Sequence, residues 1–207
     1  MKRRGFLITF EGIDGSGKTT QLRLTEKYLH QAGFPLLILR EPGSIPVAEK
    51  IRKILLNKRH RISPLSELLL YLAARAELVD KVIKPALDGG TTVLCDRFYD
   101  STTAYQGYGR CLDIKLINKL NHWAVGESVP DITFLIDVNY QTSLRRRKKK
   151  SDRLESESKS FFNRVRRGFL IIAKQERKRI VVIDGDQTAN VIFHEVSDCL
   201  KQKLKLR

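Results

Sequence analysis

The sequence has few of the residues that mark disulfide-bonded, metal-binding or membrane-spanning proteins. Its three cysteines lie far apart and form no C-x-x-C pair, so we expect reduced thiols, as in a cytoplasmic protein. The four histidines are scattered without the spacing of metal ligands. No run of eighteen apolar residues occurs, so no membrane-spanning helix is expected. The apolar run near the N-terminus is too short for a secretory signal.

Internal repeats and low-complexity linkers are also absent from the sequence. A chain of 207 residues, of which 42% are hydrophobic, can enclose one sizeable core. We therefore predict a single domain over residues 1–207.

The charge is strongly unbalanced, with 39 Lys and Arg against 23 Asp and Glu and a formal net charge of +16. Such a charge is compatible with a polyanionic partner, a phosphorylated substrate or a merely soluble basic surface. The sequence contains no helix-turn-helix, zinc-finger or aromatic RNP pattern, which argues against nucleic acid as the partner.

Short apolar runs alternate with amphipathic segments along the chain, which predicts an α/β fold. A five-stranded parallel sheet flanked by helices on both faces is expected, with ligands beyond the carboxyl ends of its strands. The predicted strands cover residues 6–10, 35–39, 92–95, 132–137 and 180–184. The predicted helices cover residues 17–32, 46–57, 113–125, 140–150, 158–177 and 188–205, with a longer one from Pro64 to the Gly89-Gly90 pair.

The stretch FEGIDGSGKTTQ, residues 10–21, matches the phosphate-binding pattern G-x-x-x-x-G-K-[ST]. It follows a predicted strand and opens a predicted helix, whereas a chance glycine-rich turn would need neither. Backbone N–H groups and the helix N-terminus can then bind nucleotide phosphates, with Lys18 on the β- and γ-phosphates and Thr19 on Mg²⁺. The residues of this loop are Gly12, Ile13, Asp14, Gly15, Ser16, Gly17, Lys18 and Thr19.

Four further stretches follow in order: REPG (40–43), YLAARAELVDKVIKPAL (71–87), DRFYDSTTAYQG (96–107) and DRLE (152–155). Together with the glycine-rich loop, they resemble the thymidylate kinase family from about residue 5 to residue 200. The resemblance implies a P-loop NTPase fold and the phosphorylation of dTMP to dTDP by ATP with Mg²⁺. It also implies a homodimer. The apolar helix at 65–87 can supply part of the dimer interface or be buried entirely in the core.

Arg40 and Arg97 each lie just past the end of a predicted strand, beside the loop. Arginine is suited to bidentate phosphate recognition, although two such residues can also be ordinary surface arginines. The resemblance implies that both bind the 5′-phosphate of dTMP.

The resemblance also implies a pocket for the base and sugar. Tyr71 and Arg75 share a helix face, with Tyr71 stacking on thymine and Arg75 donating to a base carbonyl. Without the resemblance, Tyr71 would be interpreted as a core aromatic residue. Thr102 and Gln106 match positions that line the base, and Tyr105 matches the residue packed against the sugar, where its ring disfavours ribose.

Carboxylates close to the phosphates need a separate explanation. Asp14 lies inside the loop and repels phosphate unless it faces away from ATP; the resemblance places it near the 3′-hydroxyl of the acceptor. Asp96 ends the third predicted strand and either holds Mg²⁺ through water or orients the acceptor. Glu41 is similarly placed, without a defined role.

The loop has Gly15 and Ser16 where some thymidylate kinases carry an arginine. Another cation must then reach the transferred phosphoryl group. The candidates are the basic run 145–150 and, above all, Arg153 in DRLE, within a segment 142–155 that we predict to be a mobile lid of the bacterial type. Catalytic roles are thus expected for Lys18, Arg97, Arg153 and Asp96.

Two other functions stay open at this point. One is phosphorylation of a different nucleoside or nucleotide by a kinase of similar fold, against which the pocket residues argue. The other is a basic P-loop ATPase that binds nucleic acid, which the net charge and the run RRRKKK would suit.

Overall fold

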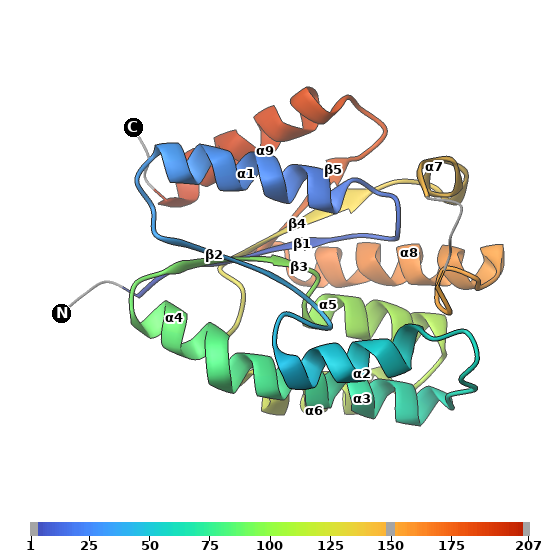
Figure 1. The fold of residues 1–207 in the computed structure, drawn as a ribbon. Coiled ribbons are helices and arrows are strands. Elements are labelled where there is room, and N and C mark those ends of the chain that lie inside the picture. The colour runs from blue at the N-terminus through green and yellow to red at the C-terminus, as the bar shows by residue number, and fades with distance from the viewer. Residues whose placement is uncertain (1–3, 148–151, 205–207) are drawn as a thin grey trace.

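The computed structural model describes residues 4–147 and 152–204. Within them, a single five-stranded parallel sheet runs in the order β2-β3-β1-β4-β5, which confirms the predicted fold class (Figure 1). The strands are β1 Leu7–Glu11, β2 Leu36–Arg40, β3 Thr92–Asp96, β4 Ile132–Asp137 and β5 Ile180–Asp184.

Helices cover both faces of the sheet, with α1 and α9 on one face and the remaining long helices on the other (Figure 1). The α-helices are α1 Lys18–Gln31, α2 Pro46–Leu56, α3 Pro64–Leu78, α4 Lys84–Asp88, α5 Tyr99–Thr102, α6 Ile114–Val125, α7 Tyr140–Arg146, α8 Lys159–Gln175 and α9 Ala189–Leu204. Two π-helical segments, Val79–Ile83 and Thr103–Gly109, link α3 to α4 and extend α5.

The three central strands, β1, β3 and β4, are buried on both faces because their side chains alternate between two cores, whereas the edge strands β2 and β5 are partly exposed. Ile8 and Phe10 of β1 pack with α1 and α9, whereas Leu7 packs with residues of α3 and α4. Within residues 4–147 and 152–204, no helix has the length and apolar character needed to cross a membrane.

The long helix predicted after Pro64 is interrupted. Pro85 has no N–H to donate, and the chain accommodates it by a π-helical turn in which the Lys84 N–H bonds to the Val79 carbonyl. The helix predicted over 140–150 ends at Arg146, and residues 148–151 lie outside the described part of the chain.

The segment after β3 is helical although the sequence indicated no helix there. Its composition, YDSTTAYQGYG over 99–109, is rich in residues with low helix propensity. Tertiary packing stabilises it, since Ala104 and Tyr105 are buried against Phe161 and Val165 of α8. This segment carries several of the predicted pocket residues.

Candidate active site

The glycine-rich loop between β1 and α1 forms a tight cradle. Gly12, Gly15 and Gly17 have φ angles of 139°, 76° and 105°, which favour glycine. A Cβ atom on Gly12 would lie 2.4 Å from the Ile136 carbonyl oxygen, and one on Gly15 would lie 2.6 Å from that of Ser143. The neighbouring backbone therefore excludes any side chain at Gly12 and Gly15.

Two polar side chains of the loop, Lys18 and Ser16, are buried in the cradle. Lys18 donates from Nζ to the Ile13 carbonyl at 2.9 Å and is buried. Burial, helped by the nearby Arg97 charge, lowers the pKa of Lys18 to about 8. The Ser16 hydroxyl is buried and has no hydrogen-bond partner among the described residues. An orphaned polar group in such a cradle fits a phosphate oxygen.

The Thr19 hydroxyl donates to Asp96 Oδ2 at 2.6 Å, so two oxygen ligands from α1 and β3 meet beside the loop. No cluster of three His, Cys, Asp or Glu residues able to hold a metal occurs within residues 4–147 and 152–204. Mg²⁺ is commonly bound by one or two protein oxygens together with substrate phosphates. The pair Thr19 and Asp96 fits that mode.

Arg97 joins the loop to the neighbouring pocket. It follows β3 with a φ of 71°, and its Nη2 bonds to Asp14 Oδ1 at 2.6 Å. Its Nη1 donates to the Gly12 carbonyl and to Ser101, both at 2.9 Å. Glu11 holds this turn by accepting the Phe98 N–H at 2.7 Å.

The Asp14 carboxylate faces the pocket and stays charged. Burial alone would raise the pKa of Asp14, but the charges of Arg97 and Lys18 outweigh burial and hold the pKa well below its usual range. The Tyr105 hydroxyl donates to Asp14 Oδ2 at 3.0 Å. Asp14 therefore presents a fixed negative charge to the pocket.

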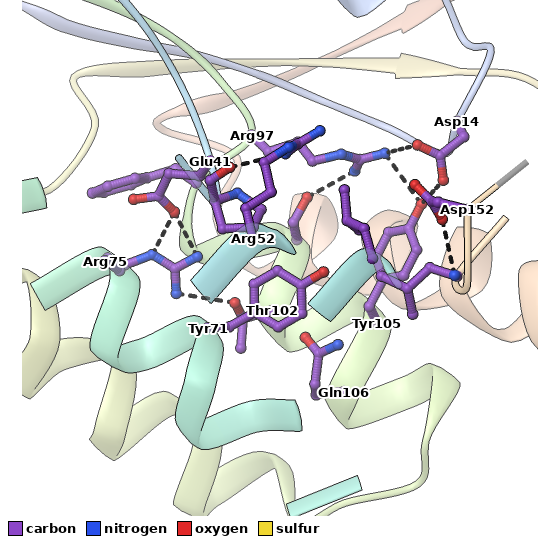
Figure 2. A pocket seen from close by; sticks show the side chains of 15 residues that line it. Asp14, Glu41, Arg52, Tyr71, Arg75, Arg97, Thr102, Tyr105, Gln106 and Asp152 are labelled. Atoms are coloured by element: carbon purple, nitrogen blue, oxygen red, sulfur yellow. Dashed lines mark hydrogen bonds and ion pairs between the residues drawn. The ribbon is translucent and has the colours of Figure 1, made fainter. Parts of the chain in front are cut away.

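A pocket opens beside these groups, between the ends of β1, β2 and β3 and the helices α2, α3 and α5 (Figure 2). Its lining contains most of the predicted acceptor residues, namely Asp14, Tyr71, Arg75, Arg97, Thr102, Tyr105 and Gln106. It also contains Glu41, Arg52 and Asp152.

Arg75 lies at the inner end of this pocket and is 2% exposed. Nε and Nη2 both bond to Glu41 Oε2 at 2.7 Å, and Nη1 donates to Thr102 at 2.9 Å. Burial outweighs Arg75 and raises the pKa of Glu41, whose other oxygen has no partner among the described residues. Glu41 thus orients Arg75.

Comparison with known proteins agrees with this geometry. Residues 10–196 match the family model described as thymidylate kinase. The thymidylate kinase of Thermoanaerobacter sp. (strain X514) is 45% identical over 202 residues, covering 97% of this chain and 100% of the relative. That of Chlorobium chlorochromatii is 42% identical over 213 residues, covering 97% of this chain and 96% of the relative.

A solved structure of thymidylate kinase from Ehrlichia chaffeensis superposes with a TM-score of 0.79 at 41% identity, covering 96% of this chain and 99% of that one. The chain belongs to the thymidylate kinase family. It is thereby a nucleoside monophosphate kinase that phosphorylates dTMP to dTDP, with ATP as the donor and Mg²⁺ as the usual metal ion.

Arg40 is the one residue predicted to bind dTMP that does not line the pocket. Its Nη2 bonds to Glu49 at 2.8 Å, and its side chain is 49% exposed. Arg52 of α2 occupies the pocket instead and donates to the Pro42 carbonyl at 2.9 Å. The sequence did not single out Arg52 because several basic residues share its helix.

Arg153 does not line the pocket, although its neighbours Asp152 and Leu154 do. Its Nη2 bonds to Glu67 at 2.5 Å and its Nε donates to the Leu55 carbonyl at 2.7 Å. Asp152, the first residue of DRLE, lines the pocket and was missed although the motif was visible.

Of the described residues in the basic run 145–150, Arg147 is the one that packs on the phosphate loop. Its Nη2 donates to the Ser143 hydroxyl at 2.7 Å, and that hydroxyl donates to the Asp14 carbonyl at 2.6 Å. Its guanidinium lies 3.9 Å from the centre of the Phe162 ring. Arg145 and Arg146 bond to Thr142 and to the Gly185 carbonyl. Lys148, Lys149 and Lys150 lie outside the described residues.

Proposed function

We propose that phosphoryl transfer takes place at the boundary between the glycine-rich loop and the pocket of Figure 2, with ATP on the loop and dTMP in the pocket. The position of Arg97 is the observation that supports this proposal most directly. It contacts Gly12 and Asp14 of the loop while lining the pocket, so one cation lies where two phosphate groups would meet. Such a cation offsets the repulsion between the reacting anions.

On the donor side, Lys18 binds the β- and γ-phosphates and the start of α1 directs backbone N–H groups at them. Thr19 and Asp96 would hold Mg²⁺, directly or through water. When bound, Mg²⁺ neutralises charge on the phosphate oxygens. The Lys18 ammonium stabilises the same charge.

On the acceptor side, Arg97 and Arg52 bind the 5′-phosphate of dTMP. Arg40 reaches that phosphate only if its guanidinium leaves Glu49, so the arrangement described here favours Arg52. Arg97 and Arg52 both carry planar guanidinium groups suited to phosphate oxygens.

The base and sugar are assigned to the inner part of the pocket. Tyr71 stacks on thymine, Arg75 donates to a base carbonyl, and Thr102 and Gln106 line the base. Tyr105 packs against the sugar and, held by Asp14, disfavours a 2′-hydroxyl. The Asp14 carboxylate is then available to the 3′-hydroxyl.

The lid over 142–155 stays a prediction, with a cation from it completing the site. Arg147 is the better-placed cation in this arrangement, because it packs on Ser143 and the loop, whereas Arg153 is bound to Glu67.

We also propose a homodimer through α3 and α6, together with a cytoplasmic location. Leu65 and Leu69 of α3 are each 51% exposed, and Leu116 and Trp123 of α6 are 45% and 72% exposed. The two helices pack against each other, so these side chains can form one apolar face.

A coupled assay for ADP release over a panel of nucleoside monophosphates tests the assignment. We expect dTMP to be preferred, and dUMP to be poorer but detectable, since one methyl group discriminates by only about 1–3 kcal/mol. Ribonucleotides should be poorer still because of Tyr105. Equal turnover of AMP, CMP or GMP would contradict the pocket assignment. DNA-stimulated ATP hydrolysis without dTMP phosphorylation would support the nucleic-acid alternative.

A further inference from the structure

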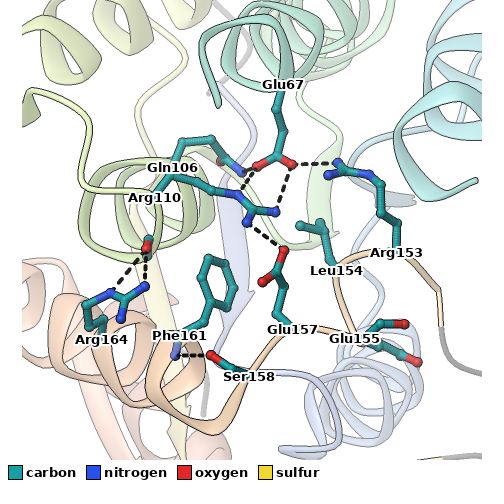
Figure 3. Close-up of polar contacts among 12 residues, drawn as sticks. Glu67, Gln106, Arg110, Arg153, Leu154, Glu155, Glu157, Ser158, Phe161 and Arg164 are labelled. Carbon is teal, nitrogen blue, oxygen red and sulfur yellow. Dashed lines mark hydrogen bonds and ion pairs between the residues drawn. The ribbon is translucent and has the colours of Figure 1, made fainter. Parts of the chain in front are cut away.

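Glu67 of α3 is a wholly buried carboxylate outside the phosphate cradle and outside the pocket lining (Figure 3). Four donor groups surround it. Oε1 accepts from Gln106 Nε2 at 2.8 Å and from Arg110 Nε at 3.1 Å. Oε2 accepts from Arg110 Nη2 at 3.1 Å and from Arg153 Nη2 at 2.5 Å. The Glu67 carboxylate is therefore the acceptor in all four hydrogen bonds.

The chemistry of this carboxylate determines how the Gln106 amide is turned. Burial alone would raise the pKa of Glu67, but hydrogen bonds from Arg110, Gln106 and Arg153 outweigh burial and lower it. Glu67 is thus ionised and can only accept hydrogen bonds. The NH₂ group of Gln106 must face Glu67, because the opposite orientation would place two oxygens against each other.

The amide oxygen of Gln106 is consequently left for the pocket. Gln106 lines the pocket beside Tyr71 and Tyr105, and its side chain is directed towards that space (Figure 2). Within residues 4–147 and 152–204, no hydrogen bond is donated to this oxygen. An acceptor in this position calls for a donor on the ligand.

We propose that Glu67 is a positioning residue that determines base specificity: by holding the Gln106 amide in one orientation, it makes the pocket require a pyrimidine that carries hydrogen on N3. The proposal deepens the proposed function and rests on the assignment of the pocket to the thymine base. Glu67 itself does not touch the substrate.

The two natural pyrimidine types differ where this acceptor would act. Thymine carries N3–H, a donor, beside the O4 acceptor, whereas cytosine carries a bare N3 acceptor beside an amino donor. A Gln106 oxygen facing N3 therefore stabilises thymine and leaves two acceptors opposed in cytosine. Arg75 adds to the same selection, since a guanidinium can only donate.

The variant Glu67→Gln tests the orientation directly, because it replaces one carboxylate oxygen with an NH₂ group of the same size. Placed at the Oε2 position, that NH₂ would oppose donors from both Arg110 and Arg153. Placed at the Oε1 position, it opposes only one arginine N–H, and Gln106 can turn its oxygen towards it. The second arrangement is favoured, and it presents the NH₂ group of Gln106 to the pocket.

The measurement is kcat/KM for dTMP and for 5-methyl-dCMP, which share the methyl group, sugar and phosphate and differ only at N3 and C4. We expect Glu67→Gln to lower the ratio of the two values by about tenfold or more, mainly through KM. Glu67→Asp keeps an acceptor-only group and should stay nearer the wild-type ratio.

Glu157→Gln is the matched control. Glu157 bonds to Arg110 Nη1 at 2.5 Å but not to Gln106, so its change removes a neighbouring carboxylate without freeing the amide. It should leave the ratio unchanged. In a Gln106→Ala background, Glu67→Gln should also leave the ratio unchanged, because the amide through which Glu67 acts is gone.

The possible outcomes distinguish the role of Glu67 from the assignment of the pocket to the thymine base. If Gln106→Ala lowers the ratio and Glu67→Gln does not, the role of Glu67 is overturned while the pocket assignment stands. If neither variant changes the ratio, the assignment of the base site itself fails.

Should Glu67→Gln not fold, NMR of the wild-type protein still decides. The Gln106 side-chain N–H signals, identified by their loss in Gln106→Ala, should resist solvent exchange with and without dTMP. Rapid exchange would contradict the proposal.

Discussion

At the scale of the residue, Lys18 combines a buried position with a functional charge. Its ammonium bonds to a carbonyl of its own loop, and its pKa is lowered to about 8. Because this pKa is lower than that of an unfolded lysine, the charged form of Lys18 lowers the free energy of unfolding. Burial of a charged lysine in the loop is thus unfavourable for folding, as is common at functional sites.

Lys18→Ala is expected to lower kcat by a factor on the order of 10² or more without loss of folding, because the charge acts most strongly in the transition state. Circular dichroism and steady-state assays check this result. The exposed Lys27→Ala, on α1, serves as the control and should behave as wild type.

The same residue predicts a pH dependence. As pH rises through about 8, the free enzyme loses the Lys18 proton, and kcat/KM for ATP should fall with it. Bound phosphates favour the charged form, so the decline in kcat should occur at higher pH. A flat kcat/KM profile from pH 7 to about 9 would show that Lys18 keeps its proton throughout this range.

At the scale of the element, α7 and the segment after it carry arginines, which the glycine-rich loop lacks. α7 ends beside the loop, and Ser143 of this helix bonds to the Asp14 carbonyl. The segment 152–155 instead lies against α2 and α3, through Arg153. Arg147 therefore lies beside the glycine-rich loop, whereas Arg153 lies beside α2 and α3.

Arg147→Ala is expected to lower kcat by a factor on the order of 10² with a modest change in KM, since its contribution grows as charge develops on the transferred group. Arg153→Ala should cost less in kcat. Rapid-quench measurement of the chemical step compares the two. A larger loss in Arg153→Ala would mean that segment 152–155 leaves Glu67 during turnover, as a closing lid requires.

At the scale of the whole molecule, the exposed apolar side chains of α3 and α6 are the feature that an isolated chain does not explain. Trp123 is 72% exposed, although large aromatic side chains are usually buried. A second copy of the chain would cover this face and the adjacent leucines.

Leu69→Glu combined with Trp123→Glu should convert a dimer into a monomer, because two charges would be buried against an apolar partner. Sedimentation equilibrium over a range of concentrations measures the change. Val191→Glu on α9, whose side chain is 44% exposed, is the control and should remain dimeric. A wild-type monomer at high concentration would remove the proposed interface.

The sequence alone determined the sheet, the loop and most of the pocket. Parallel strands buried on both faces have continuous apolar runs, and the P-loop depends on glycine at particular backbone positions. Both features can therefore be recognised from short stretches of sequence. Seven predicted acceptor residues lie together around the pocket. Arg97 follows a predicted strand end, whereas the base and sugar residues were assigned through the resemblance to thymidylate kinases.

Only the tertiary structure decided which partner each long side chain binds. Arg40 pairs with Glu49 while Arg52 faces the pocket, and Arg153 binds Glu67 rather than the loop. Residues 99–109 are helical through packing against α8, against their own propensity. These outcomes depend on contacts between segments distant in sequence, where burial and hydrogen bonding outweigh any local preference.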